Sequence, residues 1–315
     1  MPTTPIQQRI ADFRAQDRVH AGSLITTLFG DAVMPRGGRI WLGSLIRLLA
    51  PLEVSERLVR TAVFRLVKSD WLAAQACGRR TDYRLTDSGL RRFQEASRQI
   101  YASQPPRWDH RWRLLLGVGS CTPRQREQLR RALYWQGFGT LGNDAFVHPG
   151  ADLGAAVDAL LADGLGDLLP GLKPLLAADA GIGGAADDAA LVRQAWPLTE
   201  LAEVYARFIA RYAPVRAQLG DDAAQPDDGD ALLLRVLLIH DYRRLLLRDP
   251  ELPAELLPAD WLGQQARLLC KDIYRRLLSA SERHLERHFR LADGSAPPPA
   301  AGLQARFRDA DPLAA

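Results

Sequence analysis

Apolar positions recur at helical spacing along most of the chain, and short strand-like runs interrupt this pattern in two places. In the first third, the pattern predicts three helices, two short strands and a fourth helix. Their ranges are 19–29, 40–49, 55–69, 71–78, 83–85 and 86–101. Gly78-Arg79-Arg80-Thr81 is predicted to be the turn between the strands, and the segment 30–38 a further turn. Helix–helix–helix–hairpin is the order of a winged helix-turn-helix module.

A second set of elements follows the proline-containing linker 103–106. The pattern predicts a strand, a helix, one or two strands, a helix and a last strand. Their ranges are 112–118, 123–136, 137–147, 151–162 and 165–175. A βαββαβ order is that of a small ferredoxin-like domain. The small, acidic segment 177–190 is predicted to be a flexible loop.

The remainder is predicted to be helical, with long helices at 199–219, 231–248 and 260–290. The Ala/Pro-rich tail after them is predicted to be disordered. The expected fold class is therefore α+β, with three domains and a tail. Their ranges are 19–104 (winged helix-turn-helix), 108–177 (ferredoxin-like), 190–291 (helical) and 292–315 (tail).

Composition and charge change this picture in one respect. The chain of 315 residues is 47% hydrophobic and 25% charged, which is typical of a globular protein, and its apolar runs are too short to span a membrane. Three separate cysteines and the absence of a basic-then-apolar N-terminus favour a cytoplasmic location. Residues 1–113 hold 19 Lys and Arg against 10 Asp and Glu, whereas residues 151–230 hold 5 against 14. A basic first third favours a polyanionic partner, although a coding bias toward Arg is the alternative.

The helix that follows Ser55 carries the candidate chemistry. Its rear face is apolar, and its front face carries Arg57, Thr61, Arg65 and Lys68, with Arg60 at the border. Arg can donate two hydrogen bonds to a guanine, while Thr and Lys can hold phosphates. Phe64 also points outward, where we expect it to pack against the hairpin or a partner. The basic tip, Arg79 and Arg80, would reach the DNA backbone or minor groove; the alternative is a solvated helix beside a basic loop.

Signals for other chemistry are weak. Gly181-Ile182-Gly183-Gly184 follows no predicted strand and lacks the final glycine of a dinucleotide-binding loop, so we expect no cofactor. His284 and His288 lie one helical turn apart without a third ligand nearby, so we expect no metal. The rival class is an enzyme that acts on acyl-CoA or nucleic acid through the middle domain, where Asp144 is the one acidic residue near the first strands. We expect no catalytic residues and no enzyme.

Several strings in the chain resemble the PaaX family, whose members repress phenylacetic acid degradation operons. In the N-terminal third they are Ser23–Ile25, Phe29–Asp31, Arg36–Leu45, Glu56–Leu66, Gly78–Arg80 and Leu85–Asp87. Later they are Trp135–Gly139, Leu238–His240, Tyr242–Arg244 and Asp249–Pro253. The resemblance covers roughly residues 20–290. The segment 177–190 and the proline-rich tail fit no motif of the family.

The resemblance implies a winged helix, a Cas2-like middle domain and a helical C-terminal domain. It also implies a cytoplasmic homodimer that binds double-stranded operator DNA and is released by an aryl-acyl-CoA such as phenylacetyl-CoA. The DNA-binding candidates are Ser55, Arg57, Arg60, Thr61, Arg65, Lys68, Arg79 and Arg80. Phosphates favour Arg and an aryl group favours an aromatic pocket, which gives the effector candidates Trp196, Tyr205, Tyr242, Arg243 and Arg244.

Overall fold

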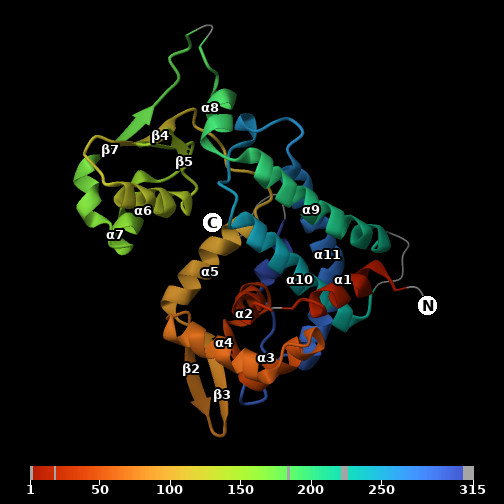
Figure 1. Cartoon of the computed structure of the whole chain (residues 1–315). Helices are drawn as coiled ribbons and strands as arrows, with labels where there is room; N and C mark the ends of the chain where they lie inside the picture. Colours follow the sequence, from red (N-terminus) through yellow and green to blue (C-terminus); the bar gives the residue numbers. More distant parts are fainter. Residues whose placement is uncertain (1–2, 18, 183–184, 221–225, 308–315) are drawn as a thin grey trace. The chain divides into compact units, whose positions relative to one another are not determined.

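The computed structural model describes residues 3–17, 19–182, 185–220 and 226–307. These residues form two compact units (Figure 1). The first unit combines described residues of 1–103, 207–244 and 264–315, and the second combines those of 104–206 and 245–263. The N-terminal elements and most of the C-terminal helices thus belong to one unit, although the sequence places them in separate domains.

The N-terminal part of the first unit consists of five α-helices and three strands in the described residues, most of which the sequence predicted. Its helices are α1 (Pro5–Arg14), α2 (Ala21–Leu28), α3 (Leu42–Leu49), α4 (Glu56–Lys68) and α5 (Asp87–Ile100). Its strands are β1 (Arg39–Trp41), β2 (Leu72–Cys77) and β3 (Arg80–Leu85), which form an antiparallel sheet in the order β1-β3-β2. Helix α1 was not predicted; a capping box of Thr4 and Gln7 begins it, and Ile6, Ile10 and Phe13 are buried.

Two local predictions in this region were wrong. Ile40 was placed in a helix, but it pairs with Tyr83 in the sheet, and α3 begins only at Leu42. The expected turn 30–38 is instead a π-helix, Phe29–Val33, followed by a 3-10 helix, Met34–Arg36. The chain turns only at Gly37 and Gly38, whose φ angles are +85° and +67°. The π-helix brings the Asp31 side chain into the interior, where it is 1% exposed.

Buried charges join these elements to the C-terminal helices α10 (Asp228–Leu246) and α11 (Leu262–His288). Arg235 of α10 contacts Asp31 at 2.7 Å and Glu282 of α11 at 2.5 Å. Glu282 also accepts a hydrogen bond from Arg36 at 2.5 Å. Apolar core residues surround these charged side chains. Ion pairs between residues far apart in sequence leave no local periodic pattern, so they could not be predicted from the sequence.

The segment expected to be a disordered tail is ordered up to Phe307. A 3-10 helix, Ala301–Ala305, lies in it, and the side chains of Leu303, Arg306 and Phe307 are buried. The Arg306 guanidinium contacts Asp31 at 3.1 Å, and the Phe307 ring lies 5.2 Å from the rings of Tyr101 and Tyr274. The Ala/Pro-rich composition predicted disorder. Burial of these three side chains offsets the conformational entropy that the segment loses when it becomes ordered. The remainder of the predicted tail lies outside the described residues.

The second unit contains the βαββαβ domain. Its elements are β4 (Trp112–Gly117), α6 (Pro123–Tyr134), β5 (Gly139–Leu141), β6 (Ala145–His148), α7 (Leu153–Ala162) and β7 (Leu172–Ala177). The antiparallel sheet has the order β5-β6-β4-β7, which is the ferredoxin-like arrangement that the sequence predicted. Leu115, Leu133 and Phe146 belong to the core between one sheet face and the two helices.

A second apolar cluster completes this unit. It includes Trp112, Val147 and Trp196 together with residues of α8 (Asp188–Ala195), the start of α9 (Leu198–Gln218) and the 3-10 helix Ala254–Leu256. Helix α8 starts inside the predicted loop 177–190, because Asp187 caps it by accepting a hydrogen bond from Ala190 N at 2.7 Å. Residues 183 and 184 of that loop lie outside the described residues.

Candidate nucleic-acid interface

Helix α4 has the two faces that the sequence predicted. Ser55 begins it as the N-cap, with its Oγ accepting a hydrogen bond from Leu58 N at 3.3 Å. Val59, Ala62 and Val63 are buried on the rear face. Burial of this face fixes which side chains the helix presents to solvent.

The front face of α4 is basic and exposed. Arg57, Arg65 and Lys68 are exposed, and within the described part of the chain they form no ion pair. Arg60 differs, because its guanidinium lies 2.6 Å from the Glu56 carboxylate one turn earlier. Thr61 also differs, because its hydroxyl donates to the Arg57 carbonyl oxygen at 2.9 Å. On α4, Arg57, Arg65 and Lys68 are therefore the cations without a competing partner among the described residues.

The two arginines at the hairpin tip have different environments. Strands β2 and β3 are joined by a two-residue turn in which Gly78 has a φ of +58° and Arg79 is exposed. The Arg80 guanidinium instead lies 4.6 Å from the centre of the Trp41 ring and donates to Ala292 O at 3.4 Å. Arg79 is therefore available to a ligand, whereas Arg80 is engaged in packing the hairpin against the unit.

A cleft of about 890 Å³ lies between the start of α2 and α4. Thr61 and Arg65 of α4 line it, together with His20 and with Arg244 from α10. Arg244, which the sequence suggested as an effector ligand, thus lies beside the basic face of α4. Its place there depends on packing between residues about 180 positions apart, for which the sequence contains no local signal.

The aromatic effector candidates divide between the two units. In the second unit, Trp196 donates its indole N–H to Gly137 O at 2.9 Å, and the buried Tyr205 donates to the Asp249 carboxylate. In the first unit, Tyr242 is buried with its ring 5.6 Å from that of Phe208. Within neither unit do the five candidates form one site.

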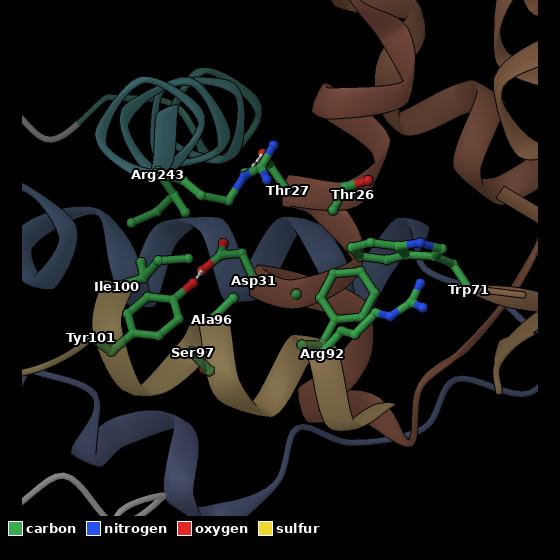
Figure 2. Close-up of a pocket in the computed structure, with 13 residues that line it drawn as sticks. Thr26, Thr27, Asp31, Trp71, Arg92, Ala96, Ser97, Ile100, Tyr101 and Arg243 are labelled. Atoms are coloured by element: carbon green, nitrogen blue, oxygen red, sulfur yellow. Dashed lines mark hydrogen bonds between the residues drawn. The ribbon is translucent and has the colours of Figure 1, made fainter. Parts of the chain in front are cut away.

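Arg243 borders a small, largely apolar pocket in the first unit (Figure 2). The pocket measures about 50 Å³, and its walls include the side chains of Trp71, Phe93 and Tyr101. The Arg243 guanidinium donates to Ser23 Oγ at 2.6 Å and to Thr27 Oγ1 at 3.3 Å, and burial lowers its pKa. The Oγ of Ser97, which also lines the pocket, is buried and has no hydrogen-bond partner among the described residues. A space of this size holds a few water-sized groups.

Residues of the rival interpretations lie in ordinary surroundings. Asp144 forms an ion pair with Arg126 at 2.8 Å. The rings of His284 and His288 lie 4.4 Å apart, but no group of three or more His, Cys, Asp or Glu in the described residues is placed to hold a metal ion. In the same part of the chain, no helix is long and apolar enough for a membrane crossing.

Three family models match successive parts of the chain. They are the PaaX-like protein model at residues 20–89, the PaaX protein central Cas2-like domain at 105–165 and the PaaX-like protein C-terminal domain at 196–287. The chain is also 39% identical to the transcriptional repressor PaaX of Escherichia coli over 292 residues, which cover 92% of this chain and 90% of that protein. Among solved structures, it is similar to the uncharacterized protein Rv0674 from Mycobacterium tuberculosis, with 28% identity, a TM-score of 0.47 and coverage of 76% of this chain and 88% of the other. The chain therefore belongs to the PaaX family.

Proposed function

We propose that this protein represses phenylacetate catabolism genes by occupying operator DNA through α4 and the β2–β3 hairpin. The observation that carries the proposal is the exposed basic face of α4, where Arg57, Arg65 and Lys68 lie opposite a buried apolar face. A helix of this kind fits the major groove, in which arginine can recognise guanine. The similarity to a protein named as a transcriptional repressor supports the same conclusion and makes this chain a regulator, not an enzyme.

In this proposal α3 and α4 form a helix-turn-helix, and the β2–β3 hairpin is its wing. Arg57, Thr61 and Arg65 read bases, while Ser55, Arg60 and Lys68 position the helix on the backbone. Arg79 at the tip reaches the minor groove or a phosphate. Arg80 contributes indirectly, because its contact with Trp41 holds the hairpin in place. Arg244 joins the basic surface next to Arg65.

Two further parts of the proposal come from the family resemblance. The repressor acts as a cytoplasmic homodimer, so that two copies of α4 enter major grooves one or more helical turns apart on an inverted repeat. An aryl-acyl-CoA such as phenylacetyl-CoA releases it by binding more tightly to the arrangement that does not fit DNA. The pocket beside Arg243 is too small for a whole acyl-CoA, so a site for it must involve other residues or a rearrangement.

The proposal is tested by fluorescence anisotropy with DNA from upstream of the protein's own gene, at two salt concentrations. We expect sequence-selective binding that weakens steeply with salt, because each phosphate contact releases counterions. Phenylacetyl-CoA should abolish the binding and free CoA should not. Selective binding that phenylacetyl-CoA does not change would contradict the proposed effector. Absence of selective binding would contradict the proposed repressor function.

A further inference from the structure

Phe64 occupies the middle of the exposed face of α4. Its side chain is 68% exposed, the third highest value among the large apolar side chains of the described residues. At 100° per residue, Phe64 lies about 20° from Arg57 and about 40° from Lys68 around the helix axis. Val59 and Ala62, about 140° and 160° from Phe64, are buried on the opposite side. The sequence left open whether Phe64 packs against the hairpin; with this exposure it does not.

The surroundings of Phe64 match one kind of ligand. Arg57 and Lys68 flank this apolar side chain along α4, and Arg65 is the next residue; none of the three forms an ion pair in the described residues. Thr61 adds to the apolar surface, because its hydroxyl is already bonded to the Arg57 carbonyl oxygen and its methyl group remains for contact. A protein surface that covered Phe64 would also have to neutralise these cations, whereas DNA supplies phosphates and apolar methyl groups together.

We propose that Phe64 determines sequence specificity by contacting the C5-methyl group of thymine in the major groove. Thymine alone among the four DNA bases presents a methyl group there, and apolar side chains are the groups that recognise it. The inference rests on the proposed DNA-binding function and adds to it a preference for thymine. In this arrangement Arg57 and Arg65 recognise neighbouring bases, and the ring of Phe64 excludes water from the contact.

The test uses the full-length protein and the tightest-binding duplex selected from random-sequence DNA. Each thymine of that duplex is replaced in turn by deoxyuridine, which lacks only the methyl group. The measured quantity is the affinity ratio between the thymine and deoxyuridine duplexes. We expect a loss of about fourfold at one or more positions for the unmodified protein, the effect of burying one methyl group. The Phe64→Ala variant should bind both duplexes equally at those positions.

Two further variants make the result decisive. Phe64→Leu keeps an apolar side chain and should retain a ratio above one if Phe64→Ala binds too weakly to measure. Ile182→Ala is the matched control, since Ile182 is 70% exposed and belongs to the second unit; its ratios should equal those of the unmodified protein.

Three results would overturn the inference. The first is equal binding of all thymine and deoxyuridine duplexes by the unmodified protein. The second is an unchanged ratio in Phe64→Ala. The third is a change of oligomeric state in Phe64→Ala with equal loss for both duplexes, which would make Phe64 a protein contact. Failure of the unmodified protein to select any sequence would instead contradict the DNA-binding function.

Discussion

Arg235 and Asp31 form an ion pair in which Nε and Oδ2 are 2.7 Å apart and both side chains are completely buried. The hydroxyls of Tyr101 and Tyr274 donate to the other carboxylate oxygen of Asp31 at 2.7 and 3.0 Å. Burial alone would raise the pKa of Asp31, but the charges of Arg235 and Arg306 outweigh it and hold the pKa below its usual value. This pair connects the π-helix after α2 to α10.

Substitution of Asp31 is therefore expected to be strongly destabilising. Asp31→Asn removes the charge that compensates Arg235 and leaves a buried cation with poorer partners. Loss of one member of a buried pair typically lowers the free energy of unfolding by about 3–5 kcal/mol. Urea unfolding at pH 7.5, followed by circular dichroism, measures the change.

The control for this substitution is Glu56→Gln. Glu56 also pairs with an arginine, Arg60, but both side chains are more than half exposed. Exposed pairs contribute little, so the unfolding midpoint should hardly move. Equal midpoint shifts for the two variants would show that the Asp31 pair does not stabilise the fold.

His240 is expected to make stability depend on pH. Burial lowers its pKa from 6.5 to about 4, and its Nδ1 lies 3.2 Å from the Thr27 hydroxyl oxygen. Below pH 6.5 the unfolded chain therefore binds a proton that the folded protein excludes until about pH 4. Stability should fall as the pH drops through this range, by about 2 kcal/mol per histidine at pH 5.

Urea unfolding between pH 7.5 and 4.5 measures this dependence. His240→Gln should reduce the slope. The remainder is expected from His148, whose pKa burial likewise lowers to about 4, and from His284, whose pKa burial also lowers. A slope that is unchanged in His240→Gln would contradict the assignment.

The ordered C-terminal segment should contribute to the stability of the first unit. Phe307 is fully buried, so Phe307→Ala leaves a cavity and is expected to cost about 3–5 kcal/mol. Gln304→Ala is the control in the same segment, because Gln304 is exposed. If thermal unfolding midpoints of both variants matched that of the unmodified protein, the segment would not be part of the folded unit.

Arg79 and Arg80 should respond differently to substitution, although they are adjacent in sequence. Arg79→Ala is expected to weaken DNA binding and to reduce the slope of log affinity against log salt by about one, as for one lost phosphate contact. Arg80→Ala removes the contact with Trp41 and is expected to lower the thermal midpoint. Anisotropy titrations at several salt concentrations and thermal unfolding of both variants test this; identical behaviour would contradict it.

The sequence predicted elements that have strong local signals. The front and rear faces of α4, the hairpin after it and the βαββαβ order follow from periodicity, from the Ser55 cap and from Gly78 at the turn. Ile40 was misassigned because an apolar run can begin in a strand and continue as a helix, and pairing with Tyr83 decides where the change occurs.

What the sequence could not predict depends on contacts between distant residues. Asp31 and Arg235 lie 204 positions apart, and Arg306 reaches the same cluster from a segment with the composition of a disordered tail. Likewise, nothing local distinguishes Arg80, whose guanidinium packs on Trp41, from Arg79, which has no such contact in the described residues. The sequence thus predicted which basic residues belong to the interface. Only the tertiary structure shows which of them are available to DNA and which contact other side chains of the protein.

The most direct test of the central claim is the DNA affinity of the Arg57→Ala/Arg65→Ala double variant. Both arginines are exposed on α4, so the variant should fold normally. Arg131→Ala/Arg193→Ala is the matched control, because both side chains are exposed and belong to the second unit. With the selected duplex, we expect the α4 variant to lose about 100-fold or more in affinity and most of its sequence preference, while the control keeps both. Equal affinity and selectivity of the α4 variant and the control would contradict the claim that α4 reads DNA.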